Sequence, residues 1–159
     1  ISSDTHPSEL PAAPAPHLSP HDVCFAVMTA LQYNDERNET LRAGSEWGRR
    51  YMWSFFGGMI RAKWGGVDEY IRQANHNPTG MANCDWFETM EDTIATIAAT
   101  ETRGALCKVV VHVRCRDAVP MAERYFLWTL QQERRPPYTG CWLISSVLPV
   151  DCALEDLTM

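Results

Sequence analysis

Residues 105–150, ALCKVVVHVRCRDAVPMAERYFLWTLQQERRPPYTGCWLISSVLPV, decide the fold of this chain. Apolar side chains recur there at every second position in three successive segments. The first segment places on one face Cys107, Val109, Val111, Val113 and Cys115. The later segments repeat the pattern with Phe126, Trp128 and Leu130, and then with Trp142, Ile144 and Leu148. Since successive side chains of a strand point to opposite faces, the stretch predicts an antiparallel meander with one packed face and one wetter face.

Helical signals precede these strands. Ser19 can cap a helix, Pro20 fits its first position and Asp22 suits its first turn, which predicts a helix running to about Asn34. Further helices are predicted over about 40–56 and over 69–74, the latter capped by Asp68, and further strands over 85–90 and 93–101. Helices followed by strands predict an α+β fold, with N-terminal helices packed on a strongly curved antiparallel sheet.

The chain has 159 residues, which fits one domain with short extensions. We expect a Pro-rich flexible arm over residues 1–18, the domain over 19–150 and an acidic tail over 151–159. The arm is read either as a leader left after processing or as a segment that lies along a partner. Because the chain opens with Ile1, we expect a processed product whose targeting leader has been removed.

The net charge is −6, from 14 basic and 20 acidic side chains, which argues against a general nucleic-acid binder. The basic pairs Arg49-Arg50 and Arg134-Arg135 are predicted to be solvated surface charge. No apolar run approaches the ~20 residues that a membrane-spanning helix needs. The sequence therefore predicts no transmembrane segment.

None of the six cysteines forms a Cys-x-x-Cys pair or a zinc-module spacing. We expect free thiols packed as small apolar groups, with a pairing of Cys141 and Cys152 left open. No metal and no cofactor are predicted.

Two blocks of the sequence resemble a known superfamily. SPHDVCFAVMTALQYND, residues 19–35, resembles the first helix of nuclear transport factor 2-like domains. AERYFLWTLQQE, residues 122–133, followed by YTGCWLISSVLPV, residues 138–150, resembles their closing hairpin. The resemblance covers about residues 19–150 and implies a cone-shaped sheet crossed by the first helix. It is closest to an uncharacterised plant and algal branch, which implies a chloroplast location.

Some members of this superfamily are isomerases or dehydratases that use the interior of the cone. Such an enzyme needs a general base and an oxyanion-stabilising group. The candidates in this sequence are Tyr33, Asp85, Glu88, Glu91 and His112. His112 alternates with the apolar face, so we expect it to point away from the core. Since no catalytic motif is present, we expect no enzymatic activity.

An apolar small-molecule binder is the second hypothesis. The aromatic stripe at Trp47, Tyr51 and Phe55, continued by Met59, favours core packing over a ligand wall. If a cavity exists, the residues expected to line it are Trp47, Tyr51, Phe55, Trp128 and Trp142.

The third and favoured hypothesis is a non-catalytic accessory or structural subunit. Such a subunit would bind partner proteins within a multi-subunit chloroplast assembly. We expect no nucleic-acid partner, and a peripheral position on a membrane complex is left open. The expected contact residues on the outer sheet face are Val110, Tyr125 and Leu127. Those expected in the arm are Pro11, Pro14 and Pro16.

Overall fold

The computed structural model describes residues 9–32, 46–74, 93–115 and 122–150. Within these ranges the helices are α1 (Pro20–Gln32), α2 (Trp47–Ser54), α3 (Gly58–Ala62) and α4 (Val67–Ala74). The strands are β1 (Thr93–Arg103), β2 (Leu106–Cys115), β3 (Ala122–Gln132) and β4 (Trp142–Val150). They form one antiparallel sheet in the order β1-β2-β3-β4. The predicted α+β meander is confirmed, and the strand predicted over 85–90 lies outside the described residues.

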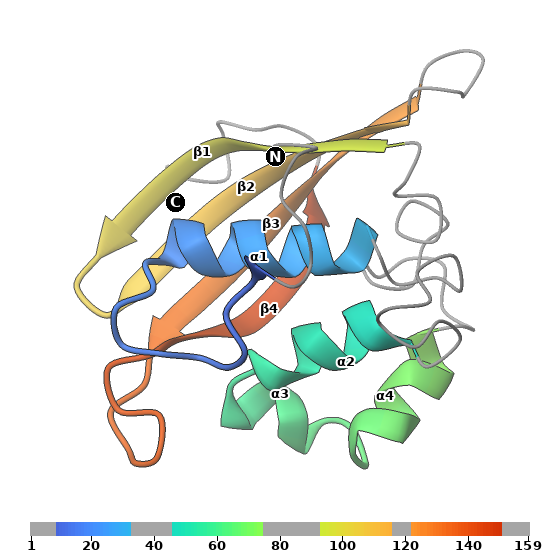
Figure 1. Cartoon of the computed structure of the whole chain (residues 1–159). Coiled ribbons are helices and arrows are strands. Elements are labelled where there is room, and N and C mark those ends of the chain that lie inside the picture. Colours follow the sequence, from blue (N-terminus) through green and yellow to red (C-terminus); the bar gives the residue numbers. More distant parts are fainter. Residues whose placement is uncertain (1–8, 33–45, 75–92, 116–121, 151–159) are drawn as a thin grey trace.

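The helices are arranged around one face of an open, twisted sheet (Figure 1). The first helix, α1, crosses that face, and α2, α3 and α4 are grouped below it. The inner face of the sheet carries the buried side chains predicted from the alternation. They include Val109, Val111, Phe126, Trp128 and Leu130, each no more than 1% exposed. The core therefore lies between α1, α2 and this face.

The start of α1 is fixed by a reciprocal cap. The Asp22 backbone N–H donates to Ser19 Oγ at 3.1 Å, and the Ser19 N–H donates to Asp22 Oδ2 at 2.9 Å. This is a capping box with aspartate in place of the usual glutamate, and Pro20 begins the helix as predicted.

Replacing Ser19 by alanine is expected to lower the free energy of unfolding by about 1 kcal/mol, because one helix N–H loses its acceptor. Urea unfolding followed by circular dichroism measures this loss. Ser19→Asp is the control, since it keeps a side-chain oxygen at the cap. An equal loss in both variants would contradict the capping role.

The second predicted helix, over about 40–56, ends two residues earlier than predicted. It ends at Ser54, and α3 starts separately at Gly58, while residues 40–45 lie outside the described ranges. Between the helices the Ile144 N–H donates to the Phe55 carbonyl at 2.7 Å, and the Gly57 N–H donates to the Ile144 carbonyl at 2.8 Å. Because Phe55 and Gly57 pair with the edge of β4, the helix that carries the aromatic stripe does not continue to Met59. Met59 is 80% exposed, so its predicted place in the stripe was wrong.

The fourth helix also differs from its prediction. It begins at Val67, so Asp68 lies in its first turn and does not cap it. There the Asp68 carboxylate accepts a hydrogen bond from Arg50 at 2.9 Å.

A bulge in β4 changes which side chains face the core. The pairing of β3 with β4 shifts between Thr129 and Leu130, so Ser145 is an extra residue between Ile144 and Ser146. A bulge of one residue moves all later side chains to the opposite face. Leu148 is consequently on the outer face and 56% exposed, which contradicts its predicted place beside Trp142 and Ile144.

Residues 9–18 pack against the domain. Leu18 is 7% exposed, and Leu10 and Ala15 are partly buried against the core. The Tyr51 hydroxyl donates to the Pro11 carbonyl at 2.7 Å. In Figure 1 this segment loops below α1 before the helix begins. Contacts with the domain therefore begin before the predicted boundary at Ser19.

Candidate functional site

The residues predicted to line a cavity belong to the packed core. Phe55 and Trp128 are fully buried, and Tyr51 and Trp142 are 8% and 9% exposed. Trp47 is half-buried and packs against the core, with its ring 5.3 Å from that of Tyr51. The Tyr51 and Phe55 rings lie 5.2 Å apart. These side chains fill the space between helices and sheet, as the core-packing interpretation of the stripe predicted.

The candidate general acids and bases are not brought together in the described part of the chain. Tyr33, Asp85, Glu88 and Glu91 lie outside it. His112 points away from the core, as predicted, and its Nε2 lies 3.0 Å from a carboxylate oxygen of Glu123. Its ring stacks on that of Tyr125 with centroids 4.4 Å apart. No group of at least three His, Cys, Asp or Glu side chains suited to a metal occurs among the described residues.

The basic pair at the start of α2 is divided between core and surface. Arg49 is 1% exposed and its Nη1 lies 3.1 Å from Glu46 Oε2, whereas Arg50 is exposed. The prediction of solvated charge was therefore wrong for Arg49. Burial raises the pKa of the nearby Tyr70, whose hydroxyl contacts the Met52 sulfur at 3.7 Å. A buried guanidinium is costly to leave without a partner, so we interpret the pairing of Arg49 with the partly exposed Glu46 as structural.

The expected apolar patch on the outer sheet face is largely covered. Val110 is fully buried and Leu127 is 8% exposed, while Tyr125 is half-buried. The predicted exposure of Val110 and Leu127 was wrong. Leu148 on β4 pairs with Leu127 on β3, and the bulge places its side chain on the outer face, where it is exposed. The outer face thus offers a smaller apolar surface than the alternation predicted.

The prolines proposed for partner contact lie in the docked segment. Pro11 and Pro14 are half-buried, and Pro16 is exposed. The Pro11 carbonyl already accepts the Tyr51 hydrogen bond, so this residue contributes to the fold of its own chain.

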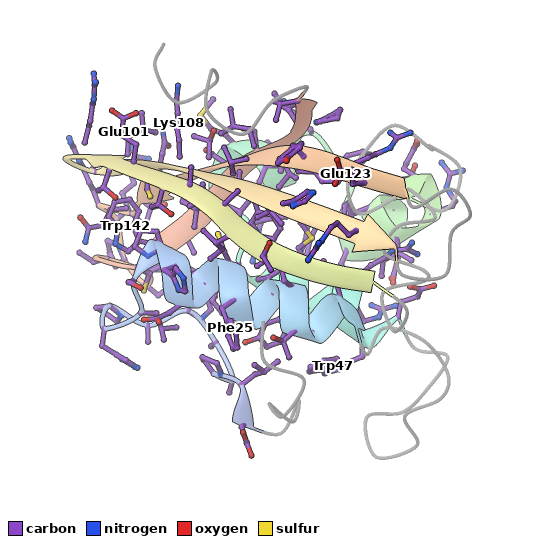
Figure 2. The ribbon with its side chains drawn as sticks, turned by 90° about the horizontal axis from the view of Figure 1, so that it is seen from above. Phe25, Trp47, Glu101, Lys108, Glu123 and Trp142 are labelled. Carbon is purple, nitrogen blue, oxygen red and sulfur yellow. The ribbon has the colours of Figure 1, made fainter. Side chains whose placement is uncertain are left out.

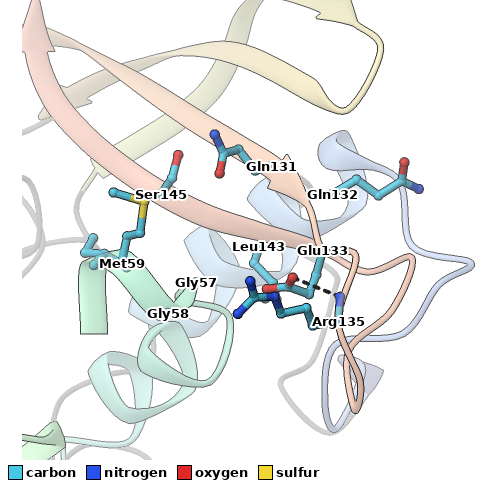
Figure 3. A pocket seen from close by; sticks show the side chains of 10 residues that line it. Gly57, Gly58, Met59, Gln131, Gln132, Glu133, Arg135, Leu143 and Ser145 are labelled. Carbon is cyan, nitrogen blue, oxygen red and sulfur yellow. Dashed lines mark hydrogen bonds between the residues drawn. The ribbon is translucent and has the colours of Figure 1, made fainter. Parts of the chain in front are cut away.

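A surface groove lies at the end of the sheet where β1 turns into β2 and β3 turns into β4. It consists of two adjoining pockets, with volumes of about 380 Å³ and 430 Å³, that share Gln131, Gln132, Glu133 and Arg135. We call their union the end groove. One wall is formed by residues 57–60 and the opposite wall by residues 133–135. Figure 3 shows Met59 on one side, Glu133 and Arg135 on the other, and Leu143 between them.

The floor of the end groove is one row of cross-strand neighbours on the outer face. Arg103 pairs with Leu106, Leu106 with Gln131, and Gln131 with Leu143. The row therefore crosses all four strands of the described sheet. Pairing of Gly57 with Ile144 brings the start of α3 against β4, so that Met59 lines the wall beside this row.

The polar groups of the end groove are held in different ways. The Glu133 carboxylate accepts hydrogen bonds from the backbone N–H groups of Arg134 and Arg135, at 2.8 Å and 3.1 Å. Gln132 donates to the Gly140 carbonyl at 3.2 Å, and Arg103 pairs with Glu101 at 2.8 Å. The arrangement can present cations, amides and apolar groups to a ligand. Sequence reasoning noted Arg134-Arg135 but missed the groove, whose residues come from separate elements.

The chain matches no known protein-family model, no curated protein and no solved structure. No described helix is long and apolar enough to cross a membrane.

Proposed function

We propose that this chain is a non-catalytic accessory subunit that binds partner proteins within a larger chloroplast assembly. The observation that carries the proposal is the filled interior between the described helices and the sheet. An enzyme or a small-molecule binder of this architecture needs a cavity between the helices and the inner face of the sheet. The side chains in that space include Met28, Phe55, Phe126 and Trp128, each no more than 1% exposed. Close packing of this kind leaves no room for a ligand beside them.

The distribution of polar groups supports the same proposal. Catalysis by general acid and base requires two titratable groups directed at one reacting atom. Several described acidic side chains instead pair with cations at the surface, as Asp68 does with Arg50 and Glu69 with Arg72. Arg72 and Gln73 hold the pKa of the Glu69 carboxyl at about 2, so it stays an ionised surface partner.

The nuclear transport factor 2-like assignment is part of the proposal. It is supported by the first helix lying across the sheet and by the closing hairpin β3–β4, the two blocks that carry the resemblance. The chloroplast location depends on the plant and algal branch that the resemblance implies.

The decisive experiment is the native size of the protein in extracts of its source organism. Size-exclusion chromatography without crosslinking, followed by immunodetection, should find the chain well above its own mass of 18.0 kDa. The purified recombinant chain is the control and should elute later. A native protein that elutes with the recombinant monomer and turns over a small carbonyl or hydroxyl substrate would replace this proposal with an enzyme.

A further inference from the structure

We infer that the end groove binds an extended, acidic segment of a partner protein that also presents an apolar side chain. The inference rests on the proposed function and specifies the chemistry of the partner. Its position is new, because neither the Pro-rich arm nor the outer residues predicted from the sequence form this groove.

Exposed apolar side chains are concentrated at the end groove. The described large hydrophobic residues with substantial exposure are Met59 at 80%, Leu106 at 36% and Leu148 at 56%. Two of these three, Met59 and Leu106, line the groove. Met59 follows the segment that pairs with β4, which fixes its backbone at the groove wall. Methionine is unbranched and polarisable, so it suits contact with an apolar side chain of variable shape.

The charge of the groove is opposite to that of the whole chain. Its basic end carries Arg103, Arg134 and Arg135, and Lys108 lines the pocket that continues from it. Glu101 and Glu133 are the acidic side chains there, so four cations and two anions give a local charge of +2 on a chain of −6. Figure 2 shows Glu101 and Lys108 close together at this end of the sheet. This polarity attracts an acidic segment and repels a basic one.

The shape of the groove fits an extended peptide. Its floor crosses four strands, which at about 4.8 Å between neighbours spans about 15 Å. An extended chain covers that distance in four or five residues at about 3.3 Å each. The Gln131 amide on the floor offers both a donor and an acceptor for the backbone of such a segment.

A nucleic acid fits the groove less well. Single-stranded binding sites combine cations with aromatic side chains on which bases stack. No residue that lines the two pockets is aromatic. A site for phosphates alone also gives no role to Met59 and Leu106. The groove therefore matches a protein segment that has both acidic and apolar side chains.

Fluorescence polarisation on the full chain tests the inference. The probes are fluorescein-labelled dodecapeptides with four acidic residues and one Leu or Phe at varied spacing. Matched peptides replace either the acids by Gln or the apolar residue by Ser. We expect saturable binding of at least one acidic apolar peptide, weaker binding of both matched forms, and loss of affinity when salt rises from about 0.05 M to about 0.5 M.

Variants localise that binding to the groove. Arg134→Glu with Arg135→Glu should weaken it at least tenfold, and Met59→Ser about fivefold. The control Lys63→Glu with Arg72→Glu changes the net charge equally at exposed positions outside the lining, and it should change affinity less than twofold. Circular dichroism confirms that each variant is folded.

Three results would overturn the inference. They are the absence of binding across the panel, binding that survives the reversal of Arg134 and Arg135, and tighter binding of a dT12 oligonucleotide than of any peptide. If peptide binding fails while the native chain still elutes within a large assembly, the groove is wrong and the accessory function stands. If the native chain elutes alone, the accessory function itself fails.

Discussion

Replacing Trp128 by alanine is expected to lower the free energy of unfolding by about 3–5 kcal/mol, the usual cost of removing a buried large aromatic side chain. Trp128 is fully buried on the inner face of β3, in register with Val109 on one side and Val147 on the other. Its removal leaves a cavity between the sheet and the helices. Urea unfolding monitored by circular dichroism should show a lower midpoint with an unchanged slope.

Leu148→Ala is the matched control for Trp128→Ala. Leu148 lies on the adjacent strand but on the opposite face, and its exposure predicts a loss below about 1 kcal/mol. The pair also tests the bulge at Ser145. Without that extra residue, Leu148 would join Ile144 in the core, and the two variants would then lose comparable stability.

Local patterns in the sequence were sufficient to predict the elements that depend on near neighbours. The cap at Ser19 and Asp22 is a contact between residues three positions apart, so its signal lies within one turn. The inner face of β2, with Cys107, Val109 and Val111, follows from strict alternation. Such features need no knowledge of what packs against them.

Features that depend on distant pairing could not be predicted from local patterns. The stripe from Trp47 to Met59 continues at helical spacing, but Phe55 and Gly57 hydrogen-bond to β4 instead. The burial of Arg49 depends on its ion pair with Glu46 and on the helices around it. The end groove combines α3, the sheet floor and the β3–β4 loop. No spacing within one segment indicates that these elements meet.

The wrong prediction for Val110 could have been avoided from the sequence itself. Val110 was assigned to an exposed outer patch because it is out of phase with Val109 and Val111. Three consecutive valines, however, are typical of a strand that is buried on both faces. The full burial of Val110 agrees with that interpretation.

The second large effect on stability is expected from removing the N-terminal segment. Deleting residues 1–18, with Met-Gly placed before Ser19 to retain the helix cap, is expected to lower the free energy of unfolding by about 1–3 kcal/mol. The variant loses the burial of Leu18 and the hydrogen bond from Tyr51 to Pro11. The net loss is smaller than the sum of these contacts, because the shortened chain no longer has to order residues 9–18.

Two further variants separate the contributions of the arm. Deleting residues 1–8 removes neither contact, so its urea midpoint is the reference from which the effect of losing residues 9–18 is measured. Tyr51→Phe removes the hydrogen bond alone and should cost about 1 kcal/mol. If deletion of residues 1–18 leaves the midpoint at this reference, the docked segment contributes nothing to the fold, and Pro11, Pro14 and Pro16 are then free to contact a partner. A loss in the expected range instead makes residues 9–18 part of the domain. Among the described residues, the end groove and the exposed part of the outer face would then be the candidate surfaces for assembly.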